Sequence, residues 1–374
     1  MPKRGENIYK REDGRWEGRY RKGRRPDGKL SYGYVYARKY GDCKEKLDQA
    51  KAQCRYAPDT VKKCGTGKAS DFLRYWLSGI TKPHVKVSTF SNYAAIMEKW
   101  LLPYFGDRNL YKVGREEVQC FVSNLSEHQL SPGTVRNIYS VLQAATKKAK
   151  EYGYLSVNPC EGIRLPRIEK KEARLLTLPE QKRLEQAAKE DKNGFAILLA
   201  SYTGLRVGEI CGLSWKDVDL ESGVLRVSKT IRRVQCYEPD RSSRTMLVMG
   251  SAKSSCSARI IPLPSGILDL FRQHRKTAAG NYVFEYREHP LEPRTLQYRF
   301  QALLKKAELP SINFHALRHT FATRCIELCF DIKTLSEILG HASAKMTLDR
   351  YGHSQMEHKR LVMGSLDGLF ARSA

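Results

Sequence analysis

The spacing of apolar positions changes along the chain, and each spacing predicts a different architecture. In residues 1–65, short runs of alternating apolar and polar residues are separated by glycine-containing turns, a pattern typical of strands. These runs predict strands over residues 7–10, 15–20 and 30–36, followed by a helix over residues 43–56. We therefore expect a small three-stranded sheet with one helix behind it.

In residues 66–168 the apolar positions recur every three or four residues, which is the period of an amphipathic helix. Four helices are expected, with breaks at Pro83 and at residues 103–106. Ser70 is a candidate N-cap for the first helix, and Ser131, followed by a proline, is one for the fourth. Four helices with short connections predict a bundle.

A capping box at residues 177–180 opens the third segment. An apolar helix over residues 195–202 precedes alternating strand patterns, which lead into a long hairpin at residues 235–250. After Pro264 the pattern predicts helices to the end. The chain is thus expected to be a multidomain α+β protein with domains 1–65, 66–168 and 169–374, the last one mainly helical with a β-hairpin sheet.

The charge of the chain indicates a polyanionic partner. Its 66 Lys and Arg residues exceed its 40 Asp and Glu residues, giving a formal net charge of +26. The excess is spread along the chain, since residues 1–65 alone carry 19 basic and 9 acidic residues. Such a distribution suits a protein that wraps a nucleic acid and gains affinity from counterion release. A basic ribosome-associated protein would show a similar charge.

Three groups of basic residues are candidate DNA contacts. A small sheet with arginines among aromatic residues can enter the major groove. The other two groups lie at the end of the fourth predicted helix and in the long hairpin. The candidates are Arg15, Arg19, Arg21, Arg24 and Arg25 in the sheet, Lys147 and Lys148 in the helix, and Arg241 and Arg244 in the long hairpin.

No sequence feature indicates a membrane. No run reaches 18 apolar residues, and the start of the chain has no apolar signal region. The 10 cysteines lack paired spacing, which favours reduced thiols. We therefore expect a cytoplasmic protein.

The candidate chemistry is concentrated in residues 313–353. His315 and Arg318 are three residues apart and share one helix face, His341 follows a Leu-Gly pair, and Tyr351 lies ten residues later. Arginine grips phosphate bidentately without losing its charge, and tyrosine can act as a covalent nucleophile. This combination suits attack on a phosphodiester.

A zinc site is the alternative interpretation of the same stretch. His315 and His319, with Cys325 and Cys329, could be taken for ligands. The two cysteines lie in a strongly helical run and are interpreted as small core hydrophobes, and no CxxC pair supports a structural site. No metal ion is therefore expected.

The H-x-x-R, L-G-H and tyrosine pattern resembles the tyrosine recombinase, or phage integrase, family. Thr203-Gly204-Leu205-Arg206, with Glu209 after it, is similar to the family's T-G-x-R-x-x-E element. Lys253 with the strand pattern at residues 259–263 is similar to its β-hairpin lysine. The elements occur in the correct order across residues 203–351. The N-terminal part is most like the integrases of conjugative transposons.

The resemblance implies a catalytic set of six residues. Arg206 and Arg318 would hold the phosphate oxygens, and Tyr351 would attack to leave a 3′-phosphotyrosine. His315 is the candidate general base and Lys253 the candidate general acid. The sixth, His341, would donate a hydrogen bond to the phosphate, and Glu209 is expected to fix the cationic cluster.

The resemblance also implies a biological reaction and its partners. It implies integration and excision of a mobile element through a Holliday junction, by a homotetramer on double-stranded DNA whose C-terminal tail, residues 356–370, docks in trans. The N-terminal domain would bind arm sites and the other two domains the crossover sites. An excisionase or a DNA-bending protein is a candidate accessory factor. No cofactor is expected, because the sequence has no P-loop and no carboxylate cluster for two Mg²⁺ ions.

Two other classes of protein share some of these features. A type IB topoisomerase would use the same phosphotyrosine chemistry as a monomer, without joining two DNA partners. A DNA-binding regulator would keep the basic modules but lose the catalytic set, whereas all six positions here carry competent residues.

Overall fold

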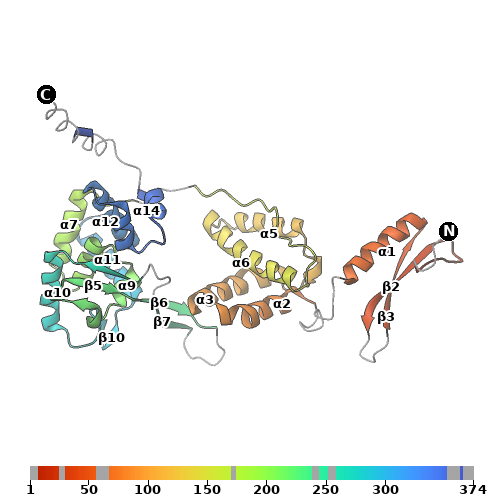
Figure 1. Ribbon diagram of the computed structural model, residues 1–374, viewed down its shortest axis with the longest axis horizontal. Coiled ribbons are helices and arrows are strands. Elements are labelled where there is room, and N and C mark those ends of the chain that lie inside the picture. The colour runs from red at the N-terminus through yellow and green to blue at the C-terminus, as the bar shows by residue number, and fades with distance from the viewer. Residues whose placement is uncertain are drawn as a thin grey trace. The chain divides into compact units, whose positions relative to one another are not determined.

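The computed structural model describes residues 7–24, 30–55, 67–169, 174–237, 244–251, 258–351 and 363–364 (Figure 1). The chain divides into two compact units, Met1–Lys170 and Lys171–Ala374. Small antiparallel sheets accompany a mainly helical chain, which confirms the predicted fold class. The three domain boundaries stay a prediction. Among the described residues, no helix is both long and apolar enough to cross a bilayer.

Residues 7–24 and 30–55 form a three-stranded sheet with one helix packed on one face. The elements are β1 (Ile8–Lys10), β2 (Trp16–Arg24), β3 (Leu30–Ala37) and α1 (Tyr40–Arg55). The strands pair antiparallel in the order β1-β2-β3. Alternation along the strands directs Ile8 and Val35 toward Cys43 and Leu47 of α1, where they form the core. The other face of the sheet is left for arginine and tyrosine side chains.

Residues 67–155 form the predicted helical bundle. Its elements are α2 (Ala69–Tyr75), η2 (Trp76–Thr81), η3 (Lys82–His84), α3 (Val87–Ile96), η4 (Met97–Leu101), α4 (Leu102–Phe105), η5 (Leu110–Lys112), α5 (Arg115–Glu127) and α6 (Pro132–Glu151). The segments η2 and η4 are π-helical continuations of α2 and α3. Phe72, Met97, Phe121 and Ile138 meet in one buried core, as the helical spacing of apolar residues predicted.

The two predicted N-caps of the bundle have different outcomes. Ser131 caps α6, because its hydroxyl accepts the backbone N–H of Thr134 at 3.2 Å. Ser70 is not a cap, since α2 begins at Ala69 with Lys68 as its N-cap residue. The N–H groups of Ala69 and Ser70 instead donate to backbone carbonyls at residues 108 and 106, so a tertiary contact replaces the side-chain cap.

The second unit is built around the apolar helix α8. Its elements are α7 (Leu178–Lys189), α8 (Phe195–Thr203), α9 (Val207–Cys211), η6 (Trp215–Asp217), β4 (Val218–Asp219), β5 (Val224–Val227), β6 (Lys229–Gln235), β7 (Thr245–Ser251), β8 (Arg259–Pro262), α10 (Ser265–Thr277), β9 (Glu285–Tyr286), β10 (His289–Pro290), α11 (Pro293–Lys306), α12 (His315–Glu327), α13 (Ile332–Leu339) and α14 (Ala344–Tyr351). The sheets have the orders β4-β5-β8, β6-β7 and β10-β9. Residues 196–200 of α8 are all buried, as expected for a helix that is apolar all round.

Two expectations for this unit are wrong. The chain after Pro264 is not only helical, because β9 and β10 form a small hairpin. Its turn residues Arg287 (φ 51°) and Glu288 (φ 65°) are left-handed, and neither is a usual signal for such a turn. Cys329 is exposed rather than in the core, because it lies beyond the end of α12 at φ 59°. Cys325 is buried, as expected.

Candidate active site

Arg318 is the largest of the fully buried side chains, with 2% exposure. It lies in the first turn of α12, which packs against α8. Its Nη1 donates to the carbonyl oxygen of Gly204 at 2.8 Å, and its Nη2 donates to that of Leu339 at 2.6 Å. Carbonyl oxygens satisfy a buried guanidinium without neutralising its charge. Arg318 is therefore a fixed positive charge near the end of α8.

Arg206 is placed by the turn that ends α8. Gly204 adopts φ 62°, a left-handed conformation, and a Cβ on it would lie 2.6 Å from the ring of Phe321. The chain then reverses into α9 with Arg206 at its N-cap position. The Arg206 side chain keeps 35% exposure while its Nη1 donates to Glu209 Oε1 at 2.8 Å. A phosphate oxygen can thus approach Arg206 from solvent.

Glu209 pairs with a second arginine, Arg259 at the start of β8. Arg259 donates from Nη1 and Nη2 to the two carboxylate oxygens, at 3.2 and 2.9 Å, in a bidentate pair. Burial opposes the ionisation of Glu209, but the hydrogen bond and charge of Arg259, followed by the charge of Arg206, outweigh it and lower its pKa to about 2. Glu209 is therefore ionised at neutral pH and joins two arginines.

The C-terminal end of α13 gathers all three arginines. The consecutive carbonyl oxygens of residues 338–340 accept hydrogen bonds from Arg259 (Nε, 2.5 Å), Arg318 (Nη2, 2.6 Å) and Arg206 (Nη2, 3.4 Å). The last carbonyls of a helix lack intrahelical partners and carry partial negative charge, so cations are stabilised there. Gly340 closes the helix at φ 65°. One helix end thus positions the cationic cluster.

His341 follows directly after this helix end and is 9% exposed. Its Nδ1 lies 2.8 Å from the hydroxyl oxygen of Thr347 on α14. The backbone N–H of His341 donates to the carbonyl oxygen of Ser336, which fixes the loop to α13. The imidazole therefore lies between the cationic cluster and the helix that ends at Tyr351.

The two histidines of α12 differ in environment. His315 is the first residue of the helix and is exposed, whereas His319 is 5% exposed. Their rings meet edge to face, with centroids 4.6 Å apart. His315 is thus the accessible imidazole of this helix, on the element that carries Arg318.

The structure brings together Arg206, Arg318 and His341, and it places His315 and Tyr351 on the neighbouring helices α12 and α14, which contact one another. Tyr351 is the last residue of α14, and its side chain is not among those described. Lys253 lies outside the described residues. Among the residues that are described, no group of three or more His, Cys, Asp or Glu could hold a metal ion.

Sequence reasoning missed the roles of Arg259 and Thr347. Arg259 begins β8, in which buried and exposed residues alternate. The available signal was a basic residue at an inward position of this strand, and in the structure Arg259 is 9% exposed. Thr347 lies one helical turn before Tyr351 and is fully buried. The spacing of four residues is visible in the sequence, but the partner of the hydroxyl is not.

The candidate DNA contacts on the sheet form a face opposite α1. Tyr9, Tyr34 and Tyr36 are exposed on this face, and the guanidinium of Arg19 lies 4.1 Å from the ring centroid of Tyr32. Arg21 is also exposed, whereas Arg15 donates to Asp13 at 2.7 Å. A plane of arginine and tyrosine side chains offers both charge and flat surfaces to a nucleic acid.

The remaining candidates vary in how far they are described. Lys147 is exposed on α6, and Lys148 pairs with Glu151 at 2.6 Å. Arg244 is exposed and directly precedes β7. For Arg24 the strand is described but its side chain is not, and Arg25 and Arg241 lie outside the described residues.

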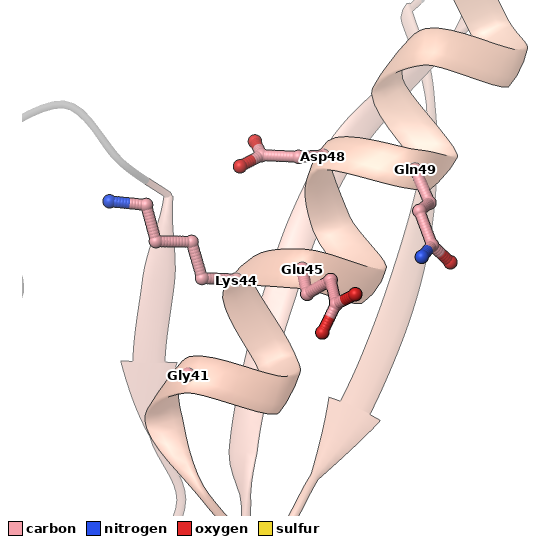
Figure 2. A pocket seen from close by; sticks show the side chains of 5 residues that line it. All are labelled: Gly41, Lys44, Glu45, Asp48 and Gln49. Atoms are coloured by element: carbon pink, nitrogen blue, oxygen red, sulfur yellow. The ribbon is translucent and has the colours of Figure 1, made fainter.

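A shallow depression of about 550 Å³ covers the outer side of α1 (Figure 2). It is lined by Gly41, Lys44, Glu45, Asp48 and Gln49, all exposed and all on this one helix. Its mixed charges contrast with the arginine and tyrosine face of the sheet. An open surface on a single helix does not enclose a ligand. The arginine cluster is therefore the better candidate for the active site.

The profile of the phage integrase family matches residues 168–358, which include the whole arginine cluster. The chain belongs to the phage integrase family. Its N-terminal SAM-like domain profile matches residues 70–126, within the helical bundle. The prediction of a tyrosine-type site-specific recombinase is thereby confirmed, and the Tn1549 transposon integrase structure described below confirms the resemblance to transposon integrases.

Individual relatives agree with this assignment to the phage integrase family. The "Tyrosine recombinase XerC-like" protein of Caldanaerobacter subterraneus subsp. tengcongensis is 29% identical over 327 residues, covering 80% of this chain and 83% of that protein. Two solved structures share the fold. The Tn1549 transposon integrase in complex with a circular intermediate DNA matches with a TM-score of 0.68 at 23% identity, over 80% of this chain and 100% of that one. A lambda integrase tetramer bound to a Holliday junction matches with a TM-score of 0.58 at 19% identity, over 90% and 96%.

Proposed function

We propose that this integrase breaks and rejoins DNA through Tyr351 to integrate and excise a mobile element. The observation that carries the proposal is the convergence of Arg206 and Arg318 on the end of α13, with His341 next in the chain and Tyr351 on the following helix. Two fixed guanidiniums can hold the non-bridging oxygens of a phosphate and stabilise the charge that develops on them.

The proton transfers fall to His315, exposed at the start of α12, and to Lys253. His315 takes the proton of the Tyr351 phenol as the oxygen attacks phosphorus. Lys253 gives a proton to the departing 5′ oxygen. His341 donates a hydrogen bond to the phosphate. The phenolic oxygen of Tyr351 is then bonded to the 3′ phosphate, and the other end of the same cleaved strand carries a free 5′ hydroxyl.

The phosphotyrosine conserves the energy of the broken phosphodiester. A 5′ hydroxyl from a second duplex can therefore attack it, restore the phenol and join the new strands. This exchange balances without ATP, and the arginines supply the charge stabilisation that a metal ion would otherwise supply. Exchange of one strand pair gives a Holliday junction, and exchange of the second resolves it.

The rest of the chain serves DNA binding and assembly in this proposal. The helical bundle and the catalytic unit bind the crossover site, and the arginine and tyrosine face of the sheet binds a separate arm site. Four copies act on two duplexes in this proposal, which is supported by the structure of a lambda integrase tetramer bound to a Holliday junction. The tail, residues 356–370, docks on a neighbouring subunit, although most of it lies outside the described residues. An excisionase or a DNA-bending protein would bias the direction.

A recombination assay on paired attachment sites tests this function. Candidate ends of the element are placed on one plasmid, and the purified protein is added in EDTA without a nucleotide. We expect excised circles with joined ends. Relaxation of supercoils without joined products would instead indicate a topoisomerase, and a strict requirement for Mg²⁺ in strand cleavage would contradict the proposed chemistry.

A further inference from the structure

Thr347 is a fully buried polar residue on α14, and the other side chains described on this helix are exposed. Within α14, residues 344–346 and 348 are exposed, while Thr347 has 0% exposure. The helix packs against α12 and α13 through this side. Thr347 also precedes Tyr351 by four residues, so the two positions lie one above the other on the helix. The side chain that anchors α14 is therefore one turn from the proposed nucleophile.

The hydroxyl of Thr347 meets the imidazole of His341. Oγ1 lies 2.8 Å from Nδ1, and both residues are buried. A buried hydroxyl proton needs an acceptor, and Nδ1 is the acceptor that the described residues place at hydrogen-bond distance from it. With Thr347 donating, Nδ1 carries a lone pair, so the proton of the neutral ring is on Nε2.

We propose that Thr347 is a positioning residue that fixes the tautomer and orientation of His341 and ties the Tyr351 helix to it. The inference rests on the proposed roles of His341 and Tyr351, and it adds Thr347 as the residue that positions their side chains. His341 needs an N–H directed at the phosphate, and the Thr347 bond leaves that N–H on Nε2. The same bond joins the loop after the arginine cluster to the helix of the nucleophile. The hydrogen bond thereby fixes the position of the phosphate-binding residues relative to the helix that carries the nucleophile.

The test compares two substitutions in single-turnover cleavage of a nicked suicide substrate. Thr347→Val keeps the shape but removes the hydroxyl, and we expect the cleavage rate to fall about tenfold, the equivalent of one hydrogen bond. Thr347→Ser keeps the hydroxyl, and its rate should stay within about threefold of wild type. Thr146→Val, at another buried threonine whose hydroxyl binds a helix carbonyl, is the matched control and should cleave normally.

A double-mutant cycle separates positioning from packing. In a His341→Ala background, Thr347→Val should have little further effect if Thr347 acts through the imidazole. Full additivity of the two changes would overturn the proposal, as would a Thr347→Val rate within about twofold of wild type. A Thr347→Ser rate as low as that of Thr347→Val would also overturn it. In contrast, failure of the wild-type protein to form any covalent adduct would count against the proposed function itself.

A spectroscopic measurement tests the proposal on the wild-type chain, so it does not depend on a variant that folds. In protein labelled with ¹⁵N-histidine, the ring shifts of His341, assigned through His341→Ala, should report a proton on Nε2 and none on Nδ1 at a pH where the ring is neutral. A proton on Nδ1 would contradict the direction of the Thr347 hydrogen bond.

Discussion

Single arginines in this protein differ in what they contribute. Arg318 is buried against carbonyl oxygens, Arg259 is matched bidentately to Glu209, and Arg206 remains partly exposed. Burial fixes the position in which the Arg318 guanidinium would meet a phosphate, bidentate pairing fixes Arg259 to Glu209, and partial exposure leaves Arg206 accessible to a substrate. Arg206 and Arg259 therefore both pair with Glu209, but only Arg206 is exposed enough to contact a substrate.

Replacing Arg206 by lysine tests the forked contact with phosphate. Arg206→Lys keeps the charge but loses the planar pair of donors, so cleavage should fall by roughly a hundredfold, as when an oxyanion donor is removed. Arg272→Lys, at an exposed position on α10 that pairs with Asp269, is the control and should have no effect. Cleavage by Arg206→Lys within about threefold of wild type would place Arg206 outside the reaction.

The ionised Glu209 predicts a pH dependence of stability. Its pKa is lowered from 4.5 to about 2 in the folded protein, so its charge stabilises the fold above pH 4.5 and this contribution is lost as the pH falls toward 2. Glu209→Gln should therefore lower the free energy of unfolding by about 3 kcal/mol at neutral pH, with a difference that shrinks below pH 4.5. Chemical unfolding across that range measures it. A difference independent of pH would contradict the assigned ionisation.

The residue types of the site were predictable from the sequence, but their connections were not. H-x-x-R, L-G-H and Tyr351 could be found because these side chains suit phosphate chemistry and their order resembles the pattern of the tyrosine recombinase family. Arg259 escaped because it is held by Glu209 and a carbonyl 50 and 79 residues away in the chain, and no local pattern encodes such contacts. Thr347 escaped for a different reason: its partner His341 is only six residues away, but it lies outside α14, so no helical spacing rule pairs the two residues.

At the scale of secondary-structure elements, α13 is the helix whose end contacts all three arginines of the site. Its last carbonyls hold three arginines, and the direction of those carbonyls depends on the left-handed Gly340 that closes the helix. The helix therefore acts through its end rather than through its faces. The strands differ, because their contribution to DNA binding would come from side chains on one face.

Adding a methyl group at Gly340 tests the role of this helix end. An alanine strains the left-handed backbone at φ 65°, so Gly340→Ala should lower stability by about 1 kcal/mol. It should also lower cleavage about tenfold, because the carbonyls that orient Arg206 and Arg318 shift. Gly153→Ala, at φ 78° just after α6 in the other unit, carries a similar backbone penalty away from α13 and is the control. Equal cleavage by the two variants would show that the end of α13 does not position the arginines.

Helices and strands were predicted best where one local rule decided them. The capping box at Thr177 and the cap at Ser131 formed as expected, because each needs only residues three apart. The prediction of a cap at Ser70 was wrong because backbone carbonyls at residues 106 and 108 accept the N–H groups of the first turn of α2. The β9–β10 hairpin was not predicted because Arg287 and Glu288 occupy its left-handed turn, where glycine or asparagine would have been the signal.

At the level of the whole chain, charge and modular order suit a protein that holds DNA at more than one site. The net charge of +26 is shared among the segments, with 19 basic residues in the first 65. The sequence predicted the sheet, the bundle and the mainly helical catalytic unit in their correct order. It gave the order of these modules but not their arrangement on DNA, which depends on contacts with DNA and with other subunits.

Deleting residues 1–65 tests the division of labour between the modules. We expect loss of arm-site binding with retained cleavage of isolated crossover-site DNA. The slope of log K against log salt should also become shallower, by roughly 0.9 for each phosphate contact that the sheet makes. Titrations of both proteins at several salt concentrations measure the change. Equal slopes together with unchanged preference between the two kinds of site would remove the arm-binding role.

The most direct measurement is the covalent adduct on a nicked crossover-site substrate, compared between wild type and Tyr351→Phe. The substitution removes one hydroxyl, so DNA affinity should persist while the covalent protein–DNA band disappears. Tyr298→Phe, at an exposed tyrosine of α11, should give a normal band. Peptide mapping of the wild-type adduct should place the nucleotide on Tyr351. A band of normal intensity from Tyr351→Phe would contradict the assignment of the nucleophile and, with it, the proposed mechanism.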